Sequence, residues 1–227
     1  MTGVAVHLFA GPSLSGSRYQ DEHGDARRAL PEVTWHGPAR RGDAQALLAQ
    51  PPGVFALADG TFHSYPSIGH IELRDLLEAG WRLFGLCSMG ALRACEMAHL
   101  GMRPWGVVAQ RYVDDPDLPD DEVALVHGAE APWLPLSEPL VHLRHFLDEM
   151  RREGVLDDER ARTVASSLRE RWYGERTLAL LRRELDAVAA PAAWPRLHAA
   201  LGEFARYRLK QRDLDQFLDA APWRLPA

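Results

Sequence analysis

Apolar runs and amphipathic stretches alternate along the first half of the chain. The apolar runs predict strands over residues 4–9, 33–36, 53–58 and 81–87. Apolar residues at helical spacing, or good helix formers after a capping residue, predict helices over residues 44–49, 68–79 and 88–98. Strands that alternate with helices are typical of a parallel sheet with right-handed crossovers. The first half is therefore predicted to be an α/β domain with three layers.

Residues 21–30 are polar and predicted to be helical near their end, and residues 100–109 are expected to form a turn and one more strand. The pattern changes after about residue 136. From there on, leucines recur at helical spacing, and the first of these helices begins at Ser137–Glu138–Pro139. We predict two domains, an α/β core over residues 1–135 and an α-helical C-terminal region over residues 136–227.

The composition of the chain argues against several classes of protein. The chain has 227 residues and a formal net charge of −6, which argues against nucleic acid as a partner. Two cysteines, Cys87 and Cys95, cannot form a disulfide framework, and no run reaches the roughly 20 apolar residues that span a membrane. The N-terminus lacks the basic start of a signal peptide, so we expect a cytoplasmic protein. Lys210 is the only lysine.

The turn from the strand at residues 81–87 to the helix at residues 88–98 is the first candidate site. Ser88 is a good N-cap residue, and Gly90 allows close approach of the backbone. Free N–H groups at a helix N-terminus suit an anion or a developing oxyanion. A well-packed corner without function explains the same residues.

Two loops that follow predicted strands add candidates. Gly11 and Ser13 lie in a Gly/Ser loop after the first strand, and Asp59–Gly60 ends the strand at residues 53–58. Ligands of α/β proteins bind outside the carboxyl ends of parallel strands, so Asp59 can project a carboxylate into such a site. Both segments can equally be simple turns.

Charged residues elsewhere leave alternatives open. His70 and Glu72 lie two apart near a helix start and point in different directions in a regular helix. Arg93 and Glu96 are spaced for a surface ion pair. The acidic loop over residues 114–122 offers oxygen ligands for magnesium, but such runs are more often solvated or paired with arginine.

Several blocks occur in an order that resembles a known family. They are Gly11–Pro12–Ser13–Leu14, the turn over residues 38–43, Asp59–Gly60, His70–Ile71–Glu72–Leu73, Ser88–Met89–Gly90–Ala91–Leu92–Arg93–Ala94–Cys95–Glu96, Gly101–Met102, Asp120–Asp121–Glu122–Val123–Ala124 and Pro135–Leu136–Ser137–Glu138. The chain resembles the TfuA-like family over roughly residues 4–145. One departure is Ile71, where family members commonly carry lysine.

The resemblance implies a role in thioamide formation with a YcaO-type partner, an enzyme that replaces the oxygen of a peptide amide by sulfur. It also implies hydrolysis of the thiocarboxylated C-terminus of a ThiS-type sulfur carrier, which releases sulfide. The peptide substrates of such pairs include precursors of ribosomal natural products. A homodimer is left open, and neither a cofactor nor a metal is expected.

On this basis we assign roles as a hypothesis. Ser88 is the nucleophile or positions the substrate for an activated water, His70 is the general base, and Glu72 orients it. The remaining candidates are expected to bind substrate: Gly11, Ser13, Asp59, Met89, Gly90, Arg93, Glu96, Asp121 and Glu122. The main rival is a non-catalytic adaptor that recruits or activates the YcaO enzyme. An ordinary serine hydrolase is a weaker rival, because the Gly-x-Ser-x-Gly motif is missing around Ser88.

Overall fold

A computed structural model describes residues 4–20, 30–61 and 64–225 of the chain. These residues form two compact units. The first contains the described residues up to 120 together with residues 129–134 and 210–225, and the second contains residues 121–128 and 135–209. Most of the segment over residues 21–30, predicted to be partly helical, lies outside the described residues. The domain boundary after residue 135 stays a prediction.

The first unit is built on a parallel sheet of five strands in the order β2-β1-β3-β4-β5. The strands are β1 (Val6–Phe9), β2 (Val33–His36), β3 (Val54–Leu57), β4 (Arg82–Gly85) and β5 (Arg103–Pro104). Its helices are α1 (Asp43–Leu47), α2 (His70–Glu78), α3 (Met89–Glu96), α4 (Gly106–Asp114) and α9 (Leu209–Ala220). Together with the helices of the second unit, these elements confirm the predicted α/β fold class with a helical C-terminal region.

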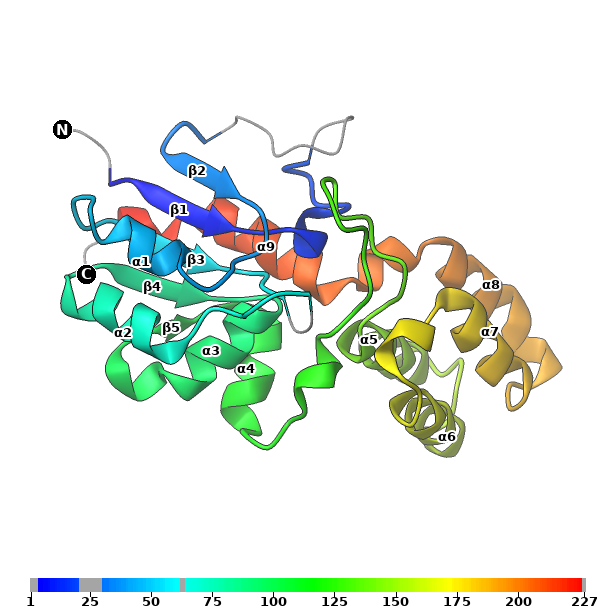
Figure 1. Ribbon diagram of the computed structural model, residues 1–227. Helices are drawn as coiled ribbons and strands as arrows, with labels where there is room; N and C mark the ends of the chain where they lie inside the picture. The colour runs from blue at the N-terminus through cyan, green and yellow to red at the C-terminus, as the bar shows by residue number, and fades with distance from the viewer. Residues whose placement is uncertain (1–3, 21–29, 62–63, 226–227) are drawn as a thin grey trace. The chain divides into compact units, whose positions relative to one another are not determined.

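Helices cover both faces of this sheet, as Figure 1 shows. On one face, side chains of α1, α2 and α3 such as Leu47, Leu76 and Ala94 pack on the strands. On the other face, Leu214, Phe217 and Leu218 of α9 pack against β1, β3 and β4. Since strands buried on both faces need apolar residues throughout, all four residues of β1 and of β3 are buried.

Residues 100–109 depart from the prediction. Only two residues, Arg103–Pro104, pair as a strand, and α4 begins at Gly106. Gly106 has φ +89°, and the side chain of Asp213 fills the space where a Cβ would stand. In α4, Val108, Ala109 and Tyr112 are buried on one face, so the β-branched residues that suggested a strand belong to a helix.

Asp213 joins α9 to α4 inside the first unit. Its Oδ2 accepts a hydrogen bond of 2.8 Å from the N–H of Val108. Its Oδ1 has no hydrogen-bond partner within the described part of the chain. Burial, offset in part by backbone hydrogen bonds from Val108 and Val107, raises the pKa of Asp213 from 3.8 to about 6.

We expect Asp213→Asn to remove a pH dependence of the stability. Because the folded-state pKa lies above the unfolded one, the contribution of Asp213 is fully present below pH 3.8 and is lost as pH rises through about 6. The loss amounts to about 3 kcal/mol in total, of which about 1 kcal/mol or more falls between pH 5 and pH 8. Urea unfolding at these two pH values measures it.

The matched control is Asp117→Asn, which changes an exposed carboxylate in the loop after α4 of the same unit. It should leave the pH dependence of the wild-type protein in place. An Asp213→Asn variant whose stability changes with pH as the wild type does would contradict the assignment.

The second unit is helical. It contains α5 (Leu140–Arg152), α6 (Asp158–Arg169), α7 (Leu178–Asp186) and α8 (Trp194–Gly202). Their leucines share one apolar core with Phe146, Phe204 and Tyr207. Asp157 accepts a hydrogen bond of 2.8 Å from the N–H of Arg160 and so caps α6 as its position in the sequence predicts.

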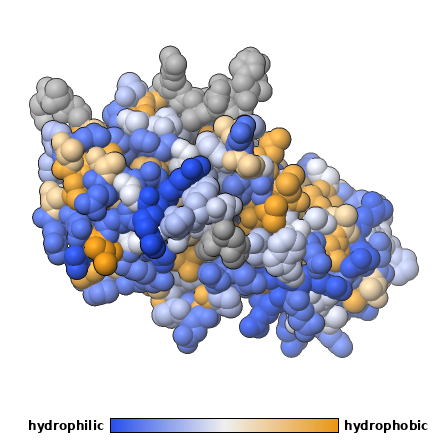
Figure 2. Space-filling view, in the orientation of Figure 1, coloured by the Kyte–Doolittle hydropathy of each residue, from blue (hydrophilic) through white to orange (hydrophobic). Residues whose placement is uncertain are grey.

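No helix of the described residues is long and apolar enough to cross a membrane. Figure 2 shows that hydrophilic side chains cover most of the visible face and that hydrophobic ones occur there in small separate patches. Of the large exposed hydrophobic side chains, Ile71 at the start of α2 is among the most exposed, at 68%.

Candidate functional site

The carboxyl ends of β1 and β3 mark the point where the strand order reverses. β1 leads to β2 on one side of it, and the later strands β3, β4 and β5 follow on the other side. In doubly wound α/β folds, ligands bind outside the strand ends at such a point. Gly11 and Ser13 follow β1, and Asp59 follows β3, so the structure brings these three predicted residues together.

Asp59 anchors the loop after β1. Its Oδ2 accepts hydrogen bonds of 2.8 Å from the N–H groups of Gly11 and Ser13, and its Oδ1 accepts one of 2.8 Å from the Ser13 hydroxyl. Asp59 and Ser13 are both buried. These three hydrogen bonds fix the loop after β1 to the end of β3, so the Asp59 carboxylate is engaged inside the fold.

Two residues that the sequence left outside the site lie next to Asp59. The Nζ of Lys210 is 4.0 Å from the Asp59 Oδ1, and both side chains are buried. The thiol of Cys87 donates a hydrogen bond of 3.1 Å to the main-chain oxygen of Lys210. Burial, reinforced by the negative charges of Asp213 and Asp59, raises the pKa of Cys87 well above its usual value. Cys87 is therefore a protonated, buried thiol that packs inside the first unit just after β4.

The corner from β4 to α3 is tightly packed against the end of β3. The N–H groups of Ser88 and Gly90 donate hydrogen bonds of 3.1 Å and 3.2 Å to the Ala58 carbonyl oxygen. A Cβ built on Gly90 would overlap the Leu57 carbonyl oxygen. Ser88 itself is only 4% exposed. The predicted side-chain cap of α3 by Ser88 is absent from the hydrogen bonds of the described residues.

An accessible charged cluster lies between α2 and α3. His70, the first residue of α2, places its Nε2 2.7 Å from Oε2 of Glu96, the last residue of α3. The same oxygen accepts a hydrogen bond of 2.6 Å from Nη1 of Arg93, whose Nε donates at 3.3 Å to the Ile68 carbonyl oxygen. The His70 side chain is 53% exposed and that of Glu96 42%. Solvent and solutes can therefore reach the imidazole.

Glu72 does not orient His70 in this structure. Its Oε1 accepts a hydrogen bond of 2.6 Å from the N–H of Gly69, and its Oε2 accepts one of 2.8 Å from the N–H of Gly42. Glu72 thus caps α2 and ties that helix to the turn before α1. Glu96 occupies the position beside the imidazole that the sequence hypothesis gave to Glu72, because residues two apart on a helix face different directions.

A cavity of about 540 Å³ opens beside this cluster. It is lined by Arg41, Gly42, Gln45, Gly69, His70, Ile71 and Glu72. Its volume is in the range of small-molecule sites, and Arg41 contributes a positive charge to its lining. The cavity is the accessible part of the candidate site.

The segment that contains Asp59 and the charged cluster of His70, Arg93 and Glu96 also identifies the family. Residues 59–177, more than half of the chain, match the sequence profile of a family described as TfuA-like protein. The chain belongs to the TfuA-like family. The matched segment contains Asp59, His70, Ser88 and Glu96, and the family is linked in general to a YcaO partner. No curated protein matches this TfuA-like chain.

The acidic loop of the TfuA-like protein pairs with arginines, which was one of the two interpretations of its sequence. Within the second unit, Asp121 Oδ2 lies 2.6 Å from Nη2 of the buried Arg176, and Glu122 Oε1 lies 2.9 Å from Nε of Arg144. No group of three His, Cys, Asp or Glu side chains suited to a metal ion occurs among the residues that the structure describes. A substrate-binding role for Asp121 and Glu122 stays a prediction.

Glu138, from the last of the family blocks, also has a structural role. It lies 3.0 Å from Nδ1 of His142 and accepts a hydrogen bond of 3.0 Å from Nε of Arg208. Burial alone would raise the pKa of Glu138, but the bonds and charges of His142 and Arg208 outweigh it and lower the pKa. The block is explained by a buried ion-pair network in the second unit.

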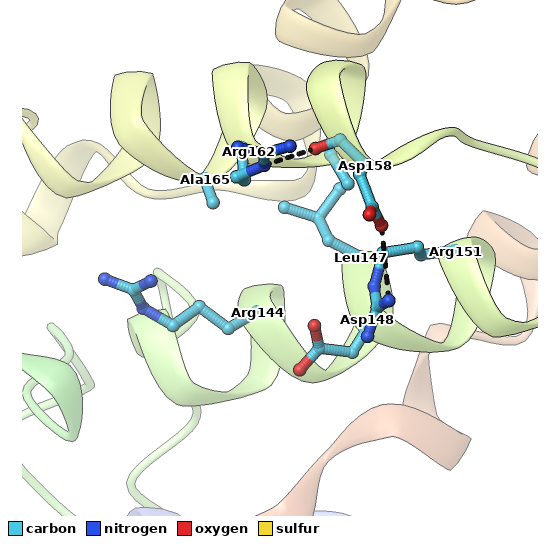
Figure 3. A pocket seen from close by; sticks show the side chains of 8 residues that line it. Arg144, Leu147, Asp148, Arg151, Asp158, Arg162 and Ala165 are labelled. Carbon is cyan, nitrogen blue, oxygen red and sulfur yellow. Dashed lines mark hydrogen bonds and ion pairs between the residues drawn. The ribbon is translucent and has the colours of Figure 1, made fainter.

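A second cavity, of about 340 Å³, lies between α5 and α6 (Figure 3). Arginines line it, but two of them are paired with carboxylates and the third donates to a main-chain oxygen. Arg151 is 3.2 Å from Asp158, Arg162 donates at 3.0 Å to the Asp158 carbonyl oxygen, and Arg144 pairs with Glu122. Asp148 adds a further negative charge to the lining. This cavity therefore offers little net charge to an anionic ligand.

Proposed function

We propose that this TfuA-like protein supports peptide thioamidation by hydrolysing the thiocarboxylated C-terminus of a ThiS-type carrier. The reaction adds water to the thiocarboxylate carbon and breaks the carbon–sulfur bond, so that a carboxylate and hydrogen sulfide are formed. The sulfide then serves the YcaO partner. The observation that carries the proposal is the exposed His70 imidazole beside the Glu96 carboxylate, which also accepts a hydrogen bond from Arg93.

His70 is the general base of the proposed reaction. A carboxylate beside an imidazole fixes its orientation and stabilises the imidazolium that forms when it takes a proton. His70 takes that proton either from water or from the Ser88 hydroxyl. Arg41 lines the cavity next to His70 and attracts the anionic thiocarboxylate. This charge stands close to Ile71, where the family commonly has lysine.

The rival proposal is a non-catalytic adaptor for the YcaO enzyme. The burial of Ser88, which is 4% exposed, favours this rival, because a nucleophile must meet its substrate. The two proposals differ in their response to inorganic sulfide. A hydrolase becomes dispensable for thioamidation when sulfide is in excess, whereas an adaptor still stimulates the reaction.

The direct test is to mix the purified protein with a thiocarboxylated carrier and measure sulfide. We expect release by the wild-type protein and, for Glu96→Gln, a rate lower by about tenfold or more, because the imidazole loses its charged partner. The matched control is Glu78→Gln, which changes a carboxylate at the end of α2 that is paired with Arg74. No release by the wild-type protein would rule out the hydrolase, and full release by both Ser88→Ala and His70→Ala would rule out this site.

A further inference from the structure

The first turn of α9 contacts the carboxyl ends of three strands. Lys210 pairs with Asp59 after β3, at 4.0 Å, and the main-chain oxygen of Lys210 accepts the hydrogen bond of Cys87 after β4. Gln211 donates a hydrogen bond of 3.4 Å to the Pro12 carbonyl oxygen in the loop after β1. One short segment, about 150 residues beyond Asp59 in the sequence, thus contacts the residues that follow β1, β3 and β4.

Lys210 and Asp59 form a charge pair that is almost completely removed from water. Lys210 is 1% exposed and Asp59 is 2% exposed. Lysine and aspartate are rarely buried to this degree unless they are paired. A buried carboxylate or ammonium that loses its partner is strongly destabilising, since its lost hydration is no longer compensated. Each charge therefore compensates part of the cost of burying the other.

We propose that Lys210 is a positioning residue of the candidate site. The Lys210 ammonium lies 4.0 Å from the Asp59 carboxylate and attracts it, and that carboxylate holds the loop after β1 through its hydrogen bonds from Gly11 and Ser13. The chain of contacts ends at the switch point, where an α/β protein binds its ligand. Lys210 lies outside the segment that matches the family, so the family assignment does not include it. The catalytic part of this inference rests on the proposed hydrolase function.

The pair can be tested without any activity because Lys210 is the only lysine of the chain. Acetylation by an amine-reactive ester modifies only this side chain and the N-terminal amine, which serves as an internal standard in mass spectrometry. We expect native Lys210 to react at least about tenfold more slowly than a lysine introduced by Gln216→Lys on the exposed side of α9. We also expect Asp59→Asn to speed the reaction of Lys210 severalfold. Equal rates for Lys210 and the introduced lysine would overturn the inference.

A double-mutant cycle measures the coupling of the two charges. Asp59→Asn and Lys210→Met are each expected to lower Tm by about 10 °C, because each removes one charge from a pair of opposite charges that are both buried. The double variant should lose clearly less than the sum of the two single losses. Additive losses would show that the pair does not exist in solution.

The kinetic test separates positioning from mere stabilisation. At a temperature where all variants are folded by circular dichroism, Lys210→Met should lower kcat for sulfide release about 10- to 100-fold with KM changed less than about twofold. Lys210→Arg should recover part of kcat, and Gln216→Met is the matched control on the same helix. A folded Lys210→Met variant with wild-type kcat would overturn the positioning role.

The two proposals fail in different ways. If the wild-type protein releases no sulfide, the hydrolase proposal fails, while the acetylation rates and the double-mutant cycle still decide whether Lys210 holds Asp59. If the wild type is active but the cycle shows no coupling, the inference about Lys210 fails alone.

Discussion

Alanine in place of His70 is expected to lower the rate of sulfide release about 10²- to 10⁴-fold, the usual contribution of a general base. The side chain is largely exposed at the start of α2, so its removal leaves no buried cavity. The fold should therefore survive, and the loss should appear in kcat and not in Tm. Steady-state sulfide release from a thiocarboxylated carrier, measured beside thermal unfolding, checks both parts.

A matched histidine makes this test specific. His99 is exposed in the turn after α3 and lies outside the cluster of Arg93 and Glu96. His99→Ala should keep the wild-type rate. Added imidazole should restore part of the activity of His70→Ala, because the base it replaces is reached from solvent. Unchanged release by His70→Ala would remove His70 from the proposed mechanism and leave the adaptor as the better proposal.

Alanine in place of Gly90 is expected to destabilise the protein by about 3 kcal/mol or more, as overpacking against a rigid neighbour does. The new Cβ would overlap the carbonyl oxygen of Leu57, which belongs to β3 and cannot swing aside as a flexible side chain does. The start of α3 would have to move away from the sheet and lose the hydrogen bond from Gly90 to Ala58. Urea unfolding of the variant measures the loss.

Gly202 supplies the control for this substitution. It also lies in a helix, α8, but a Cβ built on it would meet nothing within 4 Å among the described residues. Gly202→Ala should be neutral or stabilise the protein by up to about 1 kcal/mol through better helix propensity. A small effect of Gly90→Ala, similar to that of Gly202→Ala, would show that the corner between β4 and α3 is looser than it appears in the structure.

The sequence predicts the sheet well because its signal is local. Strands β1, β3 and β4 are apolar runs bounded by glycine or polar residues, and these runs are buried on both faces. It predicts α4 poorly, because two adjacent valines after a glycine favour a strand until tertiary packing is known. The place of α9 is not visible in the sequence, since any amphipathic helix of the second half has the same periodicity.

In the candidate site too, the sequence predicts what depends on neighbouring residues and misses contacts between residues far apart in the chain. Asp59 and the loop at Gly11 are recognisable because each follows a strand. The partner of His70 is not, because Glu96 lies 26 residues away and spacing along one helix says nothing about the next. The one signal for Lys210 is that it is the only lysine, and that acquires meaning only when the charge is found beside Asp59.

The packing of α9 has a consequence for how the chain is made. The face of the sheet formed by Val6, Leu8 and Phe84 is covered by Leu214 and Phe217, which are synthesised only after the strands themselves and after the helices of the second unit. Until they emerge, that apolar face stays open while the helices of the second unit can already form their own core. A chain truncated before residue 210 would therefore expose the apolar face of the sheet to solvent, and we expect it to aggregate or to bind chaperones.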